Sequence, residues 1–171
     1  VAAAVSAGVS GATIAEATAL AIQAARLAAG RGHWVAGADV AARIEWATGL
    51  VASHAQADRE SGWEVGAETE AAGLIYTLVG TSLATQESVP AAFAVLAAVP
   101  ADPWRACRMA ASLGGDSDTI AAMTGAIAGA CHGAGSFPSE AIAAIDAQGL
   151  GLAALAGELL ALRDGSGSEA R

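Results

Sequence analysis

Residues 114–119 combine acidic and hydroxyl side chains in a way that suits metal chemistry. The carboxylates of Asp116 and Asp118 lie two residues apart, and the hydroxyl of Thr119 follows directly. Mg²⁺ and Mn²⁺ prefer hard oxygen ligands in octahedral geometry and keep part of their water shell. The spacing makes Asp116, Asp118 and Thr119 candidate ligands of a divalent ion. Gly114 and Gly115 precede them, so the backbone can turn tightly and admit a ligand close to the main chain at Gly115.

The same acidic residues also suit a purely structural role. A carboxylate at a helix start accepts hydrogen bonds from free backbone amides and stabilises the helix by ~0.5–2 kcal/mol. Asp-x-Asp at a helix start therefore leaves capping and metal binding open as alternatives. The helix predicted to follow has Gly125, Gly129 and Gly133 at every fourth position. Each glycine costs about 1 kcal/mol of helix propensity, and together they predict a face against which another helix packs closely.

Residues that typically start or end helices occur along the whole chain. Thr13 and Glu16 form a capping box that predicts a helix to about Gly30, and Asp39 is suited to cap the next one. The stretch 54–67 is polar and predicts a loop, and 68–79 predicts a helix. A loop over 80–88 follows, with the next helix opening at Ser88-Val89-Pro90 because proline fits a first turn. Asp102 and Pro103 are suited to cap and start a further helix over 103–114. Other helices are predicted over 118–133, after 138, and over 150–163.

Composition supports an all-α fold. Of 171 residues, 54% are apolar, 15% charged and 4% aromatic, which excludes an intrinsically disordered chain and suits small-residue helix packing. No segment alternates like a sustained strand. We predict an orthogonal multi-helix array in a single domain over residues 1–163, followed by a disordered tail over 164–171. Residues 1–5 are typical of the last turns of a helix, which suggests that the chain starts within a longer protein.

The charge balance narrows the classes of partner. The chain has eight Arg, no Lys and a net charge of −9, so we expect no nucleic-acid binding, which requires a basic face. No apolar run reaches the ~18 residues of a membrane helix, so no membrane partner is expected. Cys107 and Cys131 lack Cys-x-x-Cys spacing and predict free thiols. With no signal peptide, they favour a cytoplasmic protein.

The segment from Gly114 to Gly129 resembles the C-terminal signature of the ADP-ribosylglycohydrolase family, the relatives of dinitrogenase reductase-activating glycohydrolase. Residues 87–92 resemble the family segment that precedes this signature by one helix, residues 104–113 resemble the helix between, and residues 13–30 resemble the family's middle region. The similarity covers most of residues 13–138.

This resemblance implies a binuclear Mg²⁺ or Mn²⁺ centre that hydrolyses the bond between ADP-ribose, or a related nucleotide sugar, and its acceptor. The expected partner is an ADP-ribosylated protein or a small nucleotide-sugar substrate. Asp116, Asp118 and Thr119 fall on one set of the family's metal ligands. Thr81, Ser82 and Gly115 are the substrate-binding candidates. Ser117 stands where the family commonly has Thr.

The family's other metal ligands come from an N-terminal Thr-Asp-Asp type motif, and this chain has no Asp-Asp pair. We therefore expect the chain to be the C-terminal portion of the family fold, with half of the metal site and no assigned catalytic proton donor. The alternative is a non-catalytic α-helical member that acts as a binding or structural module.

Overall fold

The computed structural model describes residues 1–33, 36–61 and 67–166, and within them every regular element is helical, without a strand. The prediction of an all-α fold is confirmed. The chain divides into two compact units, residues 1–136 and 137–171. No helix among the described residues is long and apolar enough to span a membrane.

The described residues of the first unit form seven α-helices and two short segments of other helical type. They are α1 (Ala2–Val9), α2 (Ile14–Ala28), α3 (Val40–Ser61), α4 (Ala67–Leu74) with its π-helical continuation η1 (Ile75–Val79), α5 (Thr85–Ala98), α6 (Pro103–Ala111), α7 (Ser117–His132) and the 3-10 turn η2 (Ala134–Ser136).

The second unit contains α8 (Ser139–Asp146) and α9 (Leu152–Ser166). Helix α9 continues three residues beyond Arg163, where the sequence predicted its end. The rest of the predicted tail, residues 167–171, lies outside the described residues.

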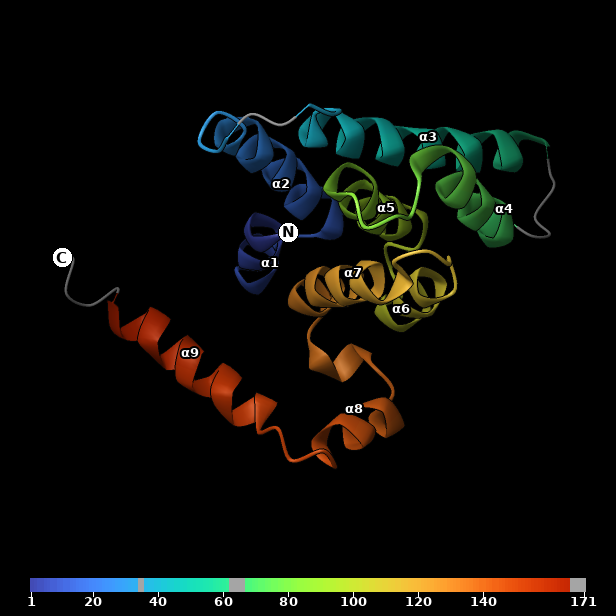
Figure 1. Cartoon of the computed structure of the whole chain (residues 1–171). Helices are drawn as coiled ribbons and strands as arrows, with labels where there is room; N and C mark the ends of the chain where they lie inside the picture. Colours follow the sequence, from blue (N-terminus) through green and yellow to red (C-terminus); the bar gives the residue numbers. More distant parts are fainter. Residues whose placement is uncertain (34–35, 62–66, 167–171) are drawn as a thin grey trace. The chain divides into compact units, whose positions relative to one another are not determined.

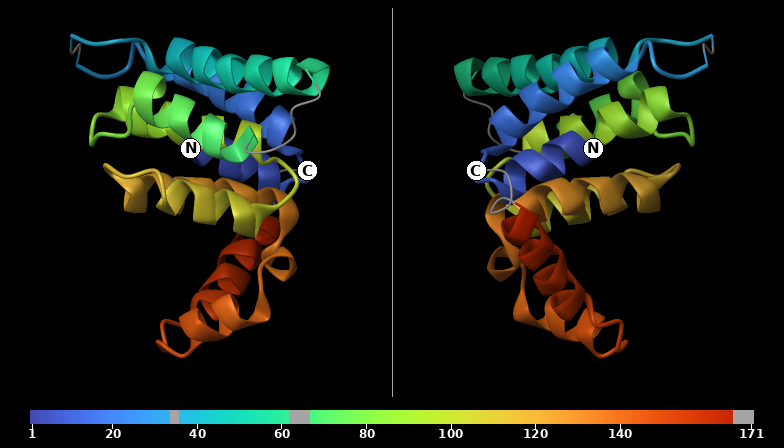
Figure 2. Two further views of the ribbon diagram at one scale, coloured as in Figure 1. Left: turned by 90° about the vertical axis from the view of Figure 1, so that its right-hand side faces the viewer. Right: turned by 90° about the vertical axis from the view of Figure 1, so that its left-hand side faces the viewer.

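Helix α5 is the centre of the first unit. It packs mainly on α3 and also contacts α6 and α7, so it lies between α3 and the α6–α7 pair (Figures 1 and 2). Its residues from Pro90 to Leu96 are all buried. A helix that is apolar on every side must be surrounded by protein, which explains why the small side chains of this segment lie in the core.

Three helix starts follow the sequence prediction. Thr13 accepts a hydrogen bond from the Glu16 amide at 3.3 Å, and the Glu16 carboxylate accepts one from the Thr13 amide at 2.8 Å. Asp39 accepts from the Ala42 amide at 2.7 Å, and Asp102 accepts from the Arg105 amide at 2.9 Å. Each bond joins residues three apart, so local sequence is sufficient to predict it. Cys107 and Cys131 are free thiols, as expected.

Two helix boundaries differ from the prediction. The polar stretch 54–67 was expected to be a loop, but α3 continues to Ser61. Its neighbour α4 contacts it, with His54 Nε2 3.0 Å from Glu70 Oε2. Helix α5 was expected to open at Ser88, but it begins at Thr85, and Pro90 therefore lies inside the helix. In both places, tertiary contacts outweigh local preference.

The close helix packing expected of the glycine face occurs at Gly125 but not at Gly133, whose Cβ position has no atom within 4 Å. It also occurs at Gly8, which the sequence did not single out. A Cβ on Gly125 would lie 3.2 Å from Cys107 Sγ on α6, so Gly125 faces that helix. The approach is closer at Gly8, where a Cβ would lie 2.8 Å from Cys131 Sγ and 2.9 Å from the Ala130 carbonyl carbon. The contact between α1 and α7 therefore depends on a glycine of α1.

Thr124 offers a test of the core of the first unit. Its side chain is fully buried on α7, and its hydroxyl has no hydrogen-bond partner within the described residues. Because Val has the same shape without the unsatisfied hydroxyl, we expect Thr124→Val to stabilise the fold by about 1 kcal/mol. Thermal unfolding should show a rise in Tm of roughly 2–4 °C.

The matched control for Thr124→Val is Thr48→Val. The Thr48 hydroxyl donates to the Ile44 carbonyl at 2.9 Å, so its removal should bring no gain. A lower Tm for Thr124→Val would show that the Thr124 hydroxyl is satisfied in solution.

Candidate functional site

The predicted metal-binding segment forms the turn between α6 and α7. Gly114 and Gly115 have φ values of +84° and +66°, a left-handed conformation that glycine adopts without strain. Leu113, immediately before them, is buried and anchors the turn to the core. Asp116 then stands at the N-cap position of α7. The expected tight glycine turn is therefore present, and it directs the acidic residues to the start of α7.

The structure brings two of the three predicted ligands into contact. The Thr119 hydroxyl donates to Asp116 Oδ1 at 2.9 Å. Asp118 lies in the first turn of the same helix, and its side chain is exposed. Within the described part of the chain, no basic side chain forms an ion pair with Asp116 or Asp118.

Asp116 does not act as a capping residue, although it occupies the N-cap position. Its side chain accepts no hydrogen bond from the backbone amides of α7, in contrast to Asp102 at the start of α6. The capping alternative from the sequence therefore does not account for Asp116. Most of the hydrogen-bonding capacity of its carboxylate stays available for another partner.

The loop of residues 80–84 packs directly against the glycine turn. The Asp116 amide donates to the Thr81 carbonyl at 2.7 Å. A Cβ on Gly115 would lie 2.2 Å from that same carbonyl oxygen, so no other residue fits at this position. Two of the substrate-binding candidates, Thr81 and Gly115, are thus brought together. The side of Gly115 where a Cβ would stand is filled by Thr81.

Ser82 is exposed and takes part in the internal hydrogen bonds of its own loop. Its amide donates to Glu87 Oε2 at 3.0 Å, and its hydroxyl oxygen accepts from the Ala84 amide at 3.2 Å. Glu87 also lies against the backbone at Gly80, where a Cβ would come 2.5 Å from Glu87 Oε2. Glu87 therefore shapes the loop that contains Thr81 and Ser82.

Sequence reasoning named neither Glu87 nor Arg43 as a site residue. Glu87 carried a signal that the expected helix start at Ser88 concealed, because an acidic residue in the first turn of a helix, as Glu87 is in α5, tends to reach back to free amides before it. Arg43 carried none. It comes from α3 and donates to the carbonyls of Val79 and Gln86, which lie 36 and 43 residues away in the chain.

The donor set fits a hard dication that keeps much of its water. Within the described residues, no three His, Cys, Asp or Glu side chains converge on one point. Asp116, Asp118 and Thr119 supply two carboxylates and a hydroxyl at the exposed start of α7. Mg²⁺ is commonly held by one or two carboxylates with several waters retained, so these residues are chemically compatible with it.

The pH dependence of stability tests the role of Glu87. Hydrogen bonds from the hydroxyl and amide of Ser82, together with the positive charge of Arg43, lower the pKa of Glu87 from its ordinary value of 4.5. A group with a lowered pKa stabilises the fold above its unfolded-state value, and this contribution is lost as the pH falls through the folded-state value.

We therefore expect Glu87→Gln to melt below the unsubstituted protein at neutral pH. The difference in Tm should stay constant down to about pH 5 and shrink below the ordinary pKa of 4.5. The measurement is thermal unfolding of both proteins from neutral pH to below pH 4.5, with the difference in Tm plotted against pH. A difference that does not change with pH would contradict the assigned contact between the Glu87 carboxylate and Ser82.

Comparison with known proteins adds a family assignment. A family model described as ADP-ribosylglycohydrolase matches residues 1–169. The match is wider than the region 13–138 on which the resemblance rested. It gives no support to the expectation that the chain holds only a C-terminal portion of the family fold with the other half missing.

The chain is also similar to a protein of Escherichia coli (strain K12) described as "Uncharacterized protein YegU". The two are 44% identical over 73 residues, which cover 43% of this chain and 22% of that protein. The matched part thus spans less than a quarter of that relative's length. No solved structure matches the chain significantly.

Proposed function

Because the chain belongs to the ADP-ribosylglycohydrolase family, we propose that it serves a metal-dependent hydrolysis of the glycosidic bond between ADP-ribose, or a related nucleotide sugar, and its acceptor. The observation that carries the proposal is the set of contacts made by the Asp116 carboxylate. It stands at the start of α7 without capping the helix, and it contacts the hydroxyl of Thr119, a second oxygen that could bind a metal ion.

We assign Asp116, Asp118 and Thr119 to the binding of Mg²⁺ or Mn²⁺. When bound, such an ion lowers the pKa of a coordinated water and orients substrate oxygens. A dication would also supply local positive charge for a diphosphate-bearing substrate, although the chain as a whole carries −9.

The residues of the glycine turn and the 80–84 loop hold the acidic start of α7 in place. The bond between the Thr81 carbonyl and the Asp116 amide sets the backbone position of Asp116. Exposed Ser82 lies in the same loop and is the candidate for direct contact with substrate hydroxyls. Glycosidic cleavage proceeds through an oxocarbenium-like transition state and uses a proton donor for the leaving group.

The test is release of ADP-ribose from an ADP-ribosylated protein in the presence of Mg²⁺ or Mn²⁺, with Mn²⁺ binding measured by calorimetry in parallel. We expect metal-dependent release and saturable binding. Binding without release would favour the non-catalytic alternative, and absence of both would contradict the proposal.

A further inference from the structure

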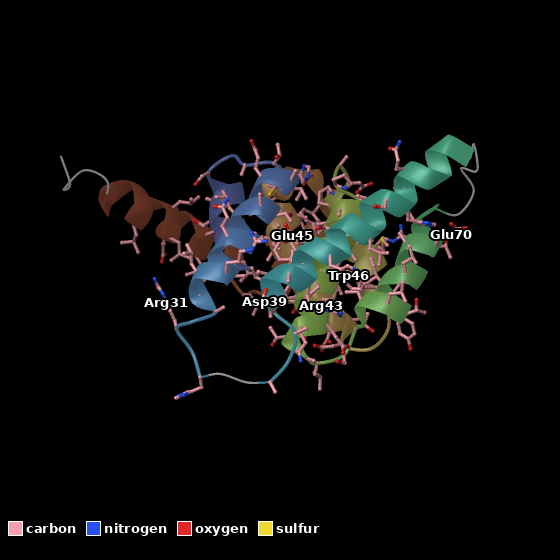
Figure 3. All side chains as sticks on the ribbon, turned by 90° about the horizontal axis from the view of Figure 1, so that it is seen from above. Arg31, Asp39, Arg43, Glu45, Trp46 and Glu70 are labelled. Atoms are coloured by element: carbon pink, nitrogen blue, oxygen red, sulfur yellow. The ribbon has the colours of Figure 1, made fainter. Side chains whose placement is uncertain are left out.

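The guanidinium group of Arg43 joins α3 to both ends of the loop that carries Thr81. Figure 3 shows Arg43 on α3, close to Trp46. One of its terminal nitrogens, Nη2, donates to the Val79 carbonyl at 2.5 Å, and Nε donates to the Gln86 carbonyl at 3.1 Å. Since residues 79 and 86 flank the loop, a single side chain spans it.

Both carbonyls need a partner for identifiable reasons. Val79 is the last residue of η1, and carbonyls at a helix end lack the amide that would follow in the helix. Gln86 lies four residues before Pro90, which has no N–H to donate to it. Partly buried carbonyls without a partner are costly, so the contact with Arg43 compensates for the proline inside α5.

The arginine is itself restrained on α3. Its guanidinium carbon lies 4.8 Å from the centroid of the Trp46 ring, within the range of a cation–π contact. Arginine suits this position because its rigid fork presents several donors in one plane, whereas lysine is a flexible point charge.

We propose that Arg43 is the positioning residue of the candidate site. It holds residues 79–86 in the conformation in which the Thr81 carbonyl accepts the Asp116 amide, and so it sets the place of the Asp116 carboxylate without touching it. The inference rests on the proposed function only in that the positioned carboxylate is a metal ligand.

Two variants of Arg43 and one matched control test this role in the full chain. Arg43→Gln removes the guanidinium group with its several N–H donors. Arg43→Lys keeps the positive charge but cannot donate to the Val79 and Gln86 carbonyls in the same geometry. The control, Arg26→Gln, removes the exposed 2.6 Å ion pair between Arg26 and Glu45. The measurements are amide hydrogen exchange without metal, Mn²⁺ affinity by calorimetry, and Tm.

In Arg43→Gln, the amides of Ser82 and Asp116 should exchange about tenfold faster, because each depends on the shape of the loop. The amides in the middle of α7 should exchange as before. Mn²⁺ should bind roughly 10-fold more weakly, the usual result of losing a residue that orients a metal ligand. Arg43→Lys should resemble Arg43→Gln, and Arg26→Gln should resemble the unsubstituted protein.

Unchanged exchange at Ser82 and Asp116 in a folded Arg43→Gln would overturn the inference. So would an Arg43→Lys protein that behaves like the unsubstituted one, because charge alone would then suffice. If Arg43→Gln does not fold, Arg43→Lys decides by the same measurements. If the unsubstituted protein binds no Mn²⁺, the proposed function fails, and the exchange data alone decide the role of Arg43.

Discussion

Asp116→Asn is expected to weaken Mn²⁺ binding by about 100-fold or more while the helical fold persists. The substitution removes the negative charge of the proposed ligand but keeps an oxygen that can accept the 2.9 Å bond from the Thr119 hydroxyl. Because the Asp116 side chain caps no amide of α7, the helix loses only a favourable charge at its start, worth about 0.3–1 kcal/mol. Calorimetry with Mn²⁺ and far-UV circular dichroism measure the two properties separately.

The matched control for this substitution is Asp102→Asn. Asp102 also stands at a helix N-cap, but its side chain does accept a bond from the Arg105 amide. We expect Asp102→Asn to leave Mn²⁺ affinity unchanged. Equal affinities of Asp116→Asn and the unsubstituted protein would remove the basis for a metal at the start of α7.

The second large effect is expected from Gly115→Ala. The added Cβ would lie 2.2 Å from the Thr81 carbonyl oxygen and 2.5 Å from the Thr81 hydroxyl, in a backbone conformation with φ of +66°. The left-handed conformation costs roughly 1–2 kcal/mol for a residue with a side chain, and the overpacking adds roughly 1–3 kcal/mol. The turn must therefore move away from the 80–84 loop, and the bond from the Asp116 amide should break.

Gly114→Ala separates the effect of backbone strain from the effect of the clash with Thr81. Gly114 also has a positive φ, of +84°, but the nearest atom to its Cβ would be Tyr76 Cε2 at an ordinary 3.5 Å. We expect Gly114→Ala to lower Tm only through backbone strain, and Gly115→Ala to lower it further and also weaken Mn²⁺ binding. Equal losses of Tm and equal Mn²⁺ affinities in the two variants would show that the contact with Thr81 does not hold the site.

Local chemistry determined what the sequence alone could predict. The capping box at Thr13, the cap at Asp102 and the glycine turn before Asp116 each depend on residues within four positions of one another. At these positions the tertiary structure leaves the short-range preference intact. The all-α class likewise followed from local features, namely the composition and the residues that start and end helices.

Tertiary structure decided how the candidate site is assembled. The Thr81 carbonyl accepts from the Asp116 amide although α5 and α6 both lie between these residues in the chain, and Arg43 reaches its partners from 36 and 43 residues away. No periodicity or spacing encodes such contacts, because they depend on how α3, α5 and α7 pack. The same packing allows Pro90 inside α5, since Arg43 supplies the donor that the Gln86 carbonyl loses.

Asp116 shows most clearly what the sequence predicts and what only the tertiary structure decides. An acidic residue at a helix start is equally suited by type to cap the helix or to bind an ion, so sequence left both open. The choice depends on where the side chain points, and that is set by the backbone of the turn. Two glycines with positive φ and the bond to Thr81 place Asp116 so that its carboxylate misses the amides of α7 and contacts Thr119 instead.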